Sequence, residues 1–169
     1  MMKTVGFGGG CHWCTEAVFS SLKGVSNVRQ GWISSEFPND AFSEAILFDF
    51  NLQEIDLETL IAIHLYTHSS TSDHTMRRKY RSAVYFPDSE IENSAKVALE
   101  NLQPDFEKPL VTQVLALSDF RLNIEEQLNY YYSDRTRPFC EVYINPKLAL
   151  LRQKFSRNID FGKLGDLAV

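Results

Sequence analysis

The sequence lacks three features: a hydrophobic run long enough to cross a bilayer, an excess of positive charge, and a large set of cysteines. A membrane-spanning helix needs about 20 apolar residues in succession, and no segment approaches that length. The formal net charge of -5 disfavours a nucleic-acid surface. The start, Met1-Met2-Lys3-Thr4, leads into glycines rather than an apolar leader. We therefore expect a cytoplasmic protein that contacts neither membrane nor nucleic acid.

The three cysteines are Cys11, Cys14 and Cys140, too few for a disulfide scaffold. Zinc would need four ligands at recognisable spacing, whereas the chain has one Cys-x-x-Cys and no second pair. Thr15, not histidine, follows Cys14, which excludes a c-type haem. We therefore expect no metal and no bound cofactor, and we expect the cysteines to serve redox or catalytic chemistry.

The chain has the length and composition of a single domain over residues 1–169, with 44% hydrophobic and 23% charged residues. Its start predicts a strand–helix–strand unit typical of α/β or α+β layers. The predicted strands lie at 2–7, 27–33, 42–50, 82–86 and 109–117. The predicted helices begin at about residues 15, 56, 88, 123 and 145. We expect 135–140 to form a loop and the tail after residue 157 to wrap the surface.

Cys11 closes the run Gly8-Gly9-Gly10 and precedes a helix that stops before Gly24. Free amides and the helix dipole at a helix N-terminus favour a thiolate. The alternative is a small buried side chain, as for most free cysteines. The glycine run and the Cys-x-x-Cys spacing favour the reactive thiol.

Glu44 alternates with apolar residues of a predicted strand, so it points inward beside Ile46 and Phe48. Partial burial favours the protonated form of a carboxyl group, which suits a proton donor. The alternative is that Glu44 lies at the mouth of the strand and reaches water.

Several residues around these two have open roles. Tyr80 precedes a strand, where its phenol could bind a polar substrate atom or simply pack. Trp13 can form the wall of a small apolar pocket beside the thiol. His12 could pair with the thiolate or face solvent. Three further histidines have no visible partner for activating a nucleophile: His64, His68 and His74.

The segment from Gly10 to Phe19, GCHWCTEAVF, resembles the signature of the class A peptide methionine sulfoxide reductases. Weaker motifs of that family follow in order from residue 4 to 155. They are Leu22-Lys23-Gly24-Val25 with Gly31-Trp32, Ser43-Glu44-Ala45, His68-Ser69-Ser70-Thr71, Tyr80-Arg81-Ser82-Ala83 and Glu125-Glu126-Gln127-Leu128-Asn129-Tyr130-Tyr131. The resemblance implies an α+β fold, a two-layer α/β sandwich with a ferredoxin-like core and helices packed on a mixed sheet.

The resemblance also implies the reduction of methionine S-sulfoxide, free or in oxidised proteins, as a protein-repair activity under oxidative stress. The Cys11 thiolate attacks the sulfoxide sulfur, while Glu44, helped by Tyr80, protonates the oxygen. Cys11 becomes a sulfenic acid, a second thiol condenses with it, and thioredoxin or another dithiol reduces the disulfide. We expect the chain to act as a monomer.

Cys14 and Cys140 are the two candidate resolving thiols. Cys14 starts within a helix and is expected to point away from Cys11, whereas Cys140 is expected on a mobile loop, so we favour Cys140. Trp13 and His12 are expected to bind the substrate. His12 stands where the family has phenylalanine, and the segment 33–41 is shorter than the family's and contains no tyrosine.

Two other functions remain open from the sequence. The Cys11/Cys14 pair at a helix start is also typical of a general thiol–disulfide oxidoreductase. The altered His12 and the shortened segments would also fit a sulfoxide-binding module without turnover.

Overall fold

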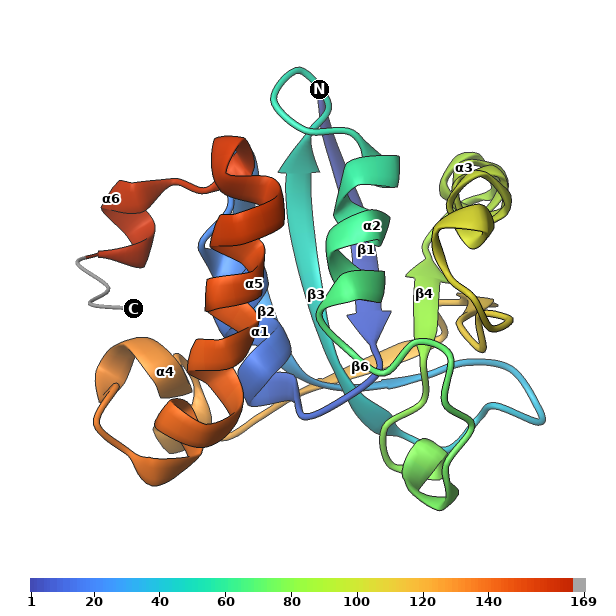
Figure 1. Ribbon diagram of the computed structural model, residues 1–169. Coiled ribbons are helices and arrows are strands. Elements are labelled where there is room, and N and C mark those ends of the chain that lie inside the picture. The colour runs from blue at the N-terminus through green and yellow to red at the C-terminus, as the bar shows by residue number, and fades with distance from the viewer. Residues whose placement is uncertain (166–169) are drawn as a thin grey trace.

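The computed structural model describes residues 1–165 as one mixed sheet with helices (Figure 1). The strands are β1 (Met2–Gly8), β2 (Val25–Ser34), β3 (Ser43–Asn51), β4 (Ala83–Phe86), β5 (Gln113–Ala116) and β6 (Asp119–Leu122). The α-helices are α1 (His12–Ser20), α2 (Leu57–Tyr66), α3 (Ser89–Leu102), α4 (Tyr130–Ser133), α5 (Asn145–Phe155) and α6 (Phe161–Leu164).

The strands form one six-stranded sheet in the order β5-β4-β1-β3-β2-β6. The β4–β5 pair is parallel, and the other neighbours are antiparallel. β3 lies between β1 and β2, so the opening strand–helix–strand unit is a split βαβ unit. The mixed sheet and the fold class predicted from the resemblance are confirmed.

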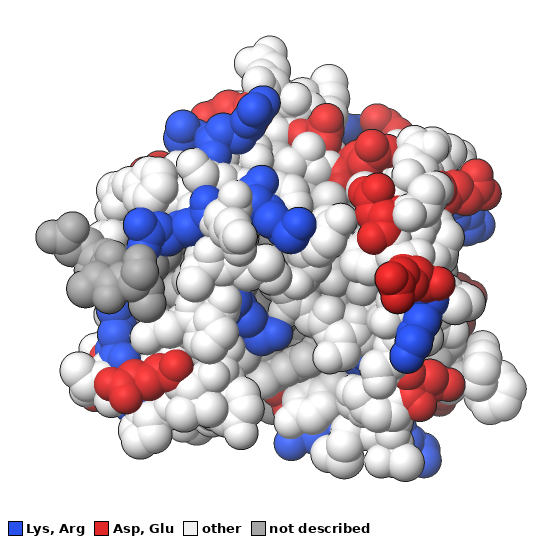
Figure 2. Space-filling model, viewed as in Figure 1, with Lys and Arg blue, Asp and Glu red and all other residues white. Residues whose placement is uncertain are grey.

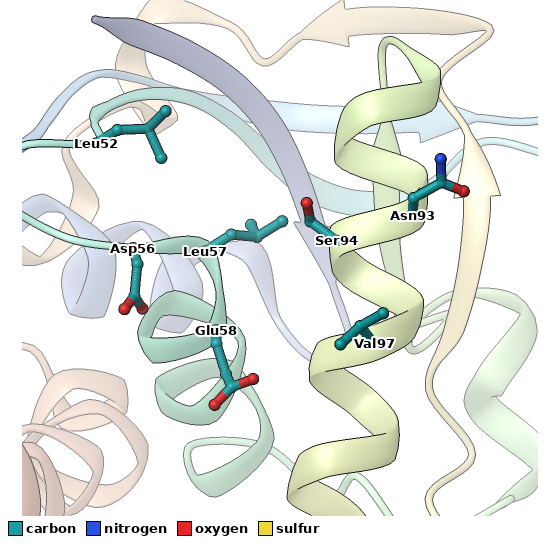
Figure 3. Close-up of a pocket in the computed structure, with 7 residues that line it drawn as sticks. All are labelled: Leu52, Asp56, Leu57, Glu58, Asn93, Ser94 and Val97. Carbon is teal, nitrogen blue, oxygen red and sulfur yellow. The ribbon is translucent and has the colours of Figure 1, made fainter.

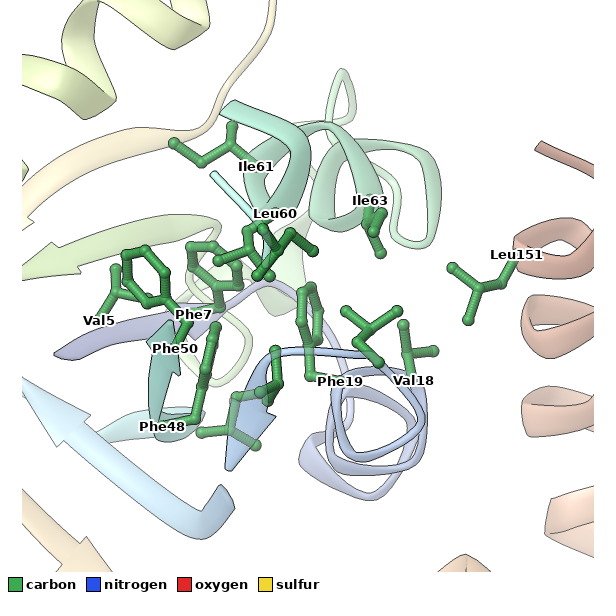
Figure 4. Packing of buried hydrophobic residues seen from close by; sticks show 14 of the residues in the cluster. Val5, Phe7, Val18, Phe19, Phe48, Phe50, Leu60, Ile61, Ile63 and Leu151 are labelled. Atoms are coloured by element: carbon green, nitrogen blue, oxygen red, sulfur yellow. The ribbon is translucent and has the colours of Figure 1, made fainter. Parts of the chain in front are cut away.

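The main hydrophobic core lies between one face of this sheet and the helices (Figure 4). Phe7 of β1, Phe48 of β3 and Phe19 of α1 meet there in edge-on and stacked ring contacts. α2 begins after Asp56, whose carboxylate accepts a hydrogen bond from the amide of Thr59 at 2.7 Å. Asp88 caps α3 in the same way, so the predicted helix starts at about residues 56 and 88 are both confirmed.

The opposite face of the sheet carries a second, smaller cluster contributed by strands. Its buried members are Ile33, Ala45, Leu47, Ala83 and Tyr85. β3 therefore sends successive side chains to two apolar surfaces, and Glu44 belongs to the helix-covered one. No helix within residues 1–165 is both long and apolar enough to span a membrane.

Three local predictions are wrong. The predicted helix from Asn123 is replaced by a short turn at Glu125–Gln127 and by α4, and β6 was not predicted. The predicted loop at 135–140 ends in helical structure, because Cys140–Ile144 forms a π-helical turn that continues into α5. The tail does not stay on the surface, since Ile159 and Leu164 are fully buried in the main core.

Candidate active site

Cys11 lies at the junction between β1 and α1, as the N-cap residue of the helix. The glycines before it are required by close packing. A Cβ atom on Gly9 would lie 2.5 Å from the His68 ring, and one on Gly8 would lie 2.9 Å from the carbonyl oxygen of Arg81. The predicted position of Cys11 at a helix N-terminus is confirmed, and the glycines allow the backbone to approach its neighbours closely.

The surroundings of Cys11 favour its thiolate. A hydrogen bond from the Cys14 thiol lowers the pKa of Cys11 most, and the amides of Trp13 and Cys14 lower it further, against the opposing effect of burial. The hydrogen bond to Cys11 and burial raise the pKa of Cys14 well above its ordinary value. Cys14 therefore keeps its proton and points at Cys11, so the expectation that it points away is wrong.

A cavity of about 320 Å³ opens at Cys11. It is lined by Gly9, Gly10, Cys11, Cys14, His68, Ser69, His74, Met76, Tyr80, Phe139, Tyr143 and Lys147. The structure therefore brings Cys11, Cys14 and Tyr80 to one cavity, as the sequence suggested for the first and last of them. Gly9, Gly10, His68 and Ser69 belong to motifs found in the sequence, whereas Lys147 and Phe139 carry no signal in the sequence that would have singled them out.

Glu44 lies at the start of β3, beside the end of β1, and is only 7% exposed. The register aligns Gly8 with Ala45, so the chain leaves β1 for Cys11 next to Glu44. Glu44 Oε1 accepts a hydrogen bond from the His12 amide at 3.2 Å, and Oε2 lies 3.6 Å from Lys79 Nζ. The expected inward orientation of Glu44 is confirmed, and the alternative in which it reaches water is wrong.

Trp13 is stacked on Tyr130, with ring centroids 4.0 Å apart and an angle of 3° between the planes. The Phe139 ring meets it edge-on, at 5.3 Å, and the Arg137 guanidinium lies 4.2 Å from the Tyr130 ring centroid. Trp13 does not line the cavity that opens at Cys11. The structure gives it a packing role behind Phe139, and its predicted substrate contact stays a prediction.

His12 is buried and also lies outside the cavity lining. Its Nδ1 lies 2.6 Å from the carbonyl oxygen of Gly31, and its Nε2 lies 3.4 Å from Glu44 Oε1. His12 thus neither faces solvent nor takes the thiolate as its partner, and both of those expectations are wrong. It contacts the proposed acid instead.

Two histidines contact the glycine run: His64 of α2 and His68, which follows the C-terminal end of that helix. His64 Nε2 donates to the carbonyl oxygen of Gly8 at 2.8 Å, and the His64 and His68 rings stack at 4.1 Å. Burial lowers the pKa of His64, and it lowers that of His68 to about 3, so both rings are neutral. No partner could be predicted for these residues, because their partners are backbone atoms and residues distant in the chain.

Cys140 is buried, and its thiol donates to the carbonyl oxygen of Asp134 at 3.5 Å. Burial raises its pKa. Cys140 does not line the cavity, but it lies close enough to contribute an electrostatic effect on the pKa of Cys14, whose rise comes first from the hydrogen bond to Cys11. Cys14 thus interacts with both of the other cysteines, Cys11 and Cys140.

A larger surface hollow of about 540 Å³ lies between α2 and α3 (Figure 3). Its two carboxylates are already engaged, Asp56 in capping α2 and Glu58 in accepting a hydrogen bond from Asn101. It contains no cysteine, histidine or serine–base pair. Within residues 1–165 no group of three or more His, Cys, Asp or Glu residues is arranged to hold a metal ion. The cavity at Cys11 is therefore the candidate active site.

Charge is distributed unevenly over the molecule. Acidic side chains gather toward the right of the face in Figure 2, over α3, whereas Lys and Arg side chains lie across its centre. The described lining of the cavity at Cys11 includes Lys147 and no acidic residue. The lining therefore adds no negative charge at the thiol, and the charge that opposes its ionisation is that of Glu44, which lies outside the lining.

Comparisons with known proteins identify the family of the chain. A family model described as peptide methionine sulfoxide reductase matches residues 3–159. Peptide methionine sulfoxide reductase MsrA of Paenarthrobacter aurescens (strain TC1) is 31% identical over 169 residues, covering 92% of this chain and 97% of the relative.

Two solved structures share the fold at low identity. The reduced form of Mxr1 from Saccharomyces cerevisiae has a TM-score of 0.69 and 18% identity, covering 84% of this chain and 91% of that chain. Mxr1 in complex with Trx2 has a TM-score of 0.58 and 19% identity, with 75% and 83% covered. The family match over residues 3–159, together with the 31% identity to the Paenarthrobacter relative, shows that the chain belongs to the peptide methionine sulfoxide reductase family.

Proposed function

We propose that the chain reduces methionine S-sulfoxide through a sulfenic acid on Cys11, with Glu44 and Tyr80 acting on the sulfoxide oxygen. Thiol-dependent reduction of methionine sulfoxide is the activity of its family. The observation that carries the residue assignment is that Cys11 and Cys14 line the same cavity, where the Cys14 side chain lowers the pKa of Cys11. This arrangement favours the thiolate of Cys11 and the protonated thiol of Cys14.

In the first step the Cys11 thiolate attacks the sulfoxide sulfur. Oxygen passes from the methionine sulfur to the cysteine sulfur, two electrons pass the other way, and one proton is taken up on the oxygen. Methionine leaves and Cys11 becomes a sulfenic acid. Glu44, buried beside the start of α1, is the proposed donor of that proton, and the Tyr80 phenol on the cavity wall is the proposed hydrogen-bond donor to the oxygen.

We assign the second step to Cys14, because it contacts Cys11 while Cys140 does not line the cavity. The Cys14 thiol condenses with the sulfenic acid, which forms a disulfide and releases one water. Cys140 is then placed to attack this disulfide at Cys14, which would move the bond away from the substrate cavity. This order differs from the sequence-based preference for Cys140 as the first resolving thiol.

Thioredoxin is the proposed partner that returns the disulfide to two thiols by exchange, with its own dithiol oxidised. The solved complex of Mxr1 with Trx2 supports this choice for a relative of the same fold. Oxidised proteins and free methionine sulfoxide are the proposed substrates, and a dithiol is the only reductant needed. All three cysteines are free, which suits the reducing cytoplasm, where we propose that the chain acts as a monomer.

The order of thiols can be tested in one turnover without reductant. Wild type, Cys14→Ser and Cys140→Ser are mixed with a peptide methionine S-sulfoxide, and the released methionine, sulfenic acid and disulfides are measured by mass spectrometry. With one equivalent of sulfoxide per chain, we expect each to form one peptide methionine, with sulfenic acid accumulating in Cys14→Ser and a Cys11–Cys14 disulfide in Cys140→Ser. Cys11→Ser should release none.

Other outcomes contradict separate parts of the proposal. A Cys11–Cys140 disulfide formed at the wild-type rate in Cys14→Ser would make Cys140 the first resolving thiol. Methionine release by Cys11→Ser would remove Cys11 from the reaction. Disulfide exchange without any methionine release in the wild type would indicate the general oxidoreductase.

A further inference from the structure

His12 holds Glu44 through two of its own groups. Its backbone amide donates to Glu44 Oε1 at 3.2 Å, and its ring Nε2 lies 3.4 Å from the same oxygen. Both side chains are buried, so water does not compete for these contacts. The proposed reaction assigns no role to His12, so it does not account for the contact between His12 and Glu44.

The other ring nitrogen fixes the tautomer. Nδ1 lies 2.6 Å from the carbonyl oxygen of Gly31, and because a carbonyl oxygen only accepts, Nδ1 carries a hydrogen. The carbonyl itself is held in place by β6, which approaches so closely that a Cβ on Gly31 would lie 1.9 Å from the Arg121 carbonyl oxygen. The Trp32 ring, with its centroid 5.2 Å from that of His12, packs against the imidazole edge-on. The imidazole therefore has a defined orientation toward Glu44.

This tautomer determines what can lie between His12 and Glu44. If His12 is neutral, its Nε2 has a bare lone pair, which would repel an ionised carboxylate. An attractive contact needs one proton between them, as either imidazolium with carboxylate or imidazole with carboxylic acid. In both forms the pair holds one transferable proton, and the reduction consumes one.

We propose that His12 is the positioning residue for Glu44 and shares with it the single proton that the sulfoxide oxygen takes up. This inference rests on the proposed role of Glu44 as the acid. Proton transfer from the pair to the oxygen leaves neutral imidazole with carboxylate, and the pair regains a proton from solvent before the next turnover. A phenylalanine ring at position 12 would fill similar space without either function.

Three other charged or titratable groups face the pair. Lys79 Nζ lies 3.6 Å from Glu44 Oε2, and the Lys79 side chain is exposed to solvent. The Cys11 thiolate lies close enough that the Glu44 charge tends to raise its pKa, against the larger lowering by Cys14. Burial raises the pKa of Glu16, and a charge on His12 opposes that rise. The contacts from β2 are the Gly31 carbonyl and the Trp32 ring, which do not titrate.

The first test observes the pair directly, by nitrogen-15 NMR of the imidazole rings in the reduced wild-type protein. We expect His12 to show a protonated Nδ1 and an Nε2 shift between those of bare and protonated nitrogen. Glu44→Gln should move the Nε2 shift, whereas His74→Gln, which changes an exposed histidine, should not. A bare Nδ1, or an Nε2 shift unaffected by Glu44→Gln, would overturn the proposal. The wild-type spectrum gives this answer even if a variant fails to fold.

The second test separates positioning from packing by the pH profile of a single turnover at saturating sulfoxide. We expect His12→Phe to slow methionine release about 10- to 100-fold at pH 8, with a smaller loss at pH 6, because the pair no longer retains a proton. His12→Gln, polar but not titratable, should show the same loss at pH 8. An equal loss at both pH values in both variants would reduce His12 to a structural residue.

The two proposals fail differently. If Glu44→Gln keeps the wild-type rate, Glu44 is not the acid, and the inference that His12 serves the reaction falls with it, although the NMR contact would persist. If Glu44→Gln is inactive but leaves the nitrogen-15 shifts of His12 unchanged, Glu44 remains the acid, and the proposal that His12 shares its proton is wrong.

Discussion

Gly9 shows how a single missing side chain sets the position of the nucleophile. Its Cα lies over the His68 ring so closely that a Cβ would approach within 2.5 Å of Cδ2, whereas the neighbouring Gly10 has no atom within 4 Å of such a Cβ. The Gly9 carbonyl also accepts a hydrogen bond from Arg77 Nη1 at 2.8 Å. Gly9 is therefore closely packed and has no space for a side chain, whereas Gly10 has open space around it.

We predict that Gly9→Ala lowers the free energy of unfolding by about 1–3 kcal/mol, as overpacking does elsewhere, because the partly buried His68 ring must move. Gly10→Ala is the matched control, with an expected change within about 0.5 kcal/mol. Urea unfolding followed by circular dichroism measures both. Equal effects of the two substitutions would contradict the packing argument.

At this scale the sequence predicted the residues whose signal is local. Cys11 follows a glycine run and begins a helix, and Glu44 alternates with apolar neighbours, so both were found. The contact of His12 with Glu44 was missed, because it joins residues 32 apart that only the sheet brings together. The direction of the Cys14 side chain was wrong because it depends on the backbone at the N-cap residue Cys11, which the Cys-x-x-Cys spacing alone does not determine.

At the scale of an element, α2 and its C-terminal end carry two neutral histidines, the buried His64 and the partly buried His68, which both lose solvation by water. The pKa of His68 is lowered to about 3, against about 6.5 for an unfolded histidine. Between these pH values the unfolded chain binds a proton that the folded chain does not. The free energy of unfolding therefore rises with pH across this window and falls on acidification.

We predict that His68→Gln makes the free energy of unfolding less dependent on pH, by about 1.4 kcal/mol per pH unit between pH 6 and pH 4. Guanidinium unfolding at several pH values gives the slope. His74→Gln, at an exposed site, should leave the slope as it is in the wild type. An unchanged slope in His68→Gln would mean that His68 titrates normally in the folded protein.

Elements with their own pattern and caps were predicted well, and elements that depend on neighbours were not. The apolar stripes and the Asp caps of α2 and α3 lie within each segment, so both helices were found. β6 has four residues, mostly exposed, and exists through its pairing with β2. The helical turn at Cys140 comes directly after Pro138-Phe139, and a segment with a proline at this place is also typical of a loop. The turn is helical because it continues into α5.

At the scale of the whole molecule, the last described segment closes onto the first helix. Ile159 forms an antiparallel bridge with Leu22, directly after α1. Lys163 Nζ donates to the carbonyl oxygens of Leu22 and Val25, at 2.8 and 2.7 Å. Leu164 is fully buried. The sequence suggested a surface tail because its apolar residues are too widely spaced to show a helical period.

We predict that Leu164→Ala lowers the free energy of unfolding by about 2–5 kcal/mol, the usual cost of truncating a fully buried leucine. Val97→Ala, at a side chain that is 54% exposed, is the control and should change it by about 0.5 kcal/mol or less. Urea unfolding followed by tryptophan fluorescence and by circular dichroism should give coincident curves for one domain. A loss near the control value would mean that this segment contributes little to the core.

The register of β1 against β3 has a consequence for how such chains can vary in length. Hydrogen bonds between the two strands align Gly8 with Ala45, and this alignment determines which β3 residue lies beside the turn into α1. A slip by one residue would turn Glu44 to the opposite face of the sheet. The connection at 35–42, which joins β2 to β3, does not enter this alignment. Insertions or deletions there can accumulate without separating nucleophile from acid, which explains how a chain with a shorter segment at this point keeps the same arrangement.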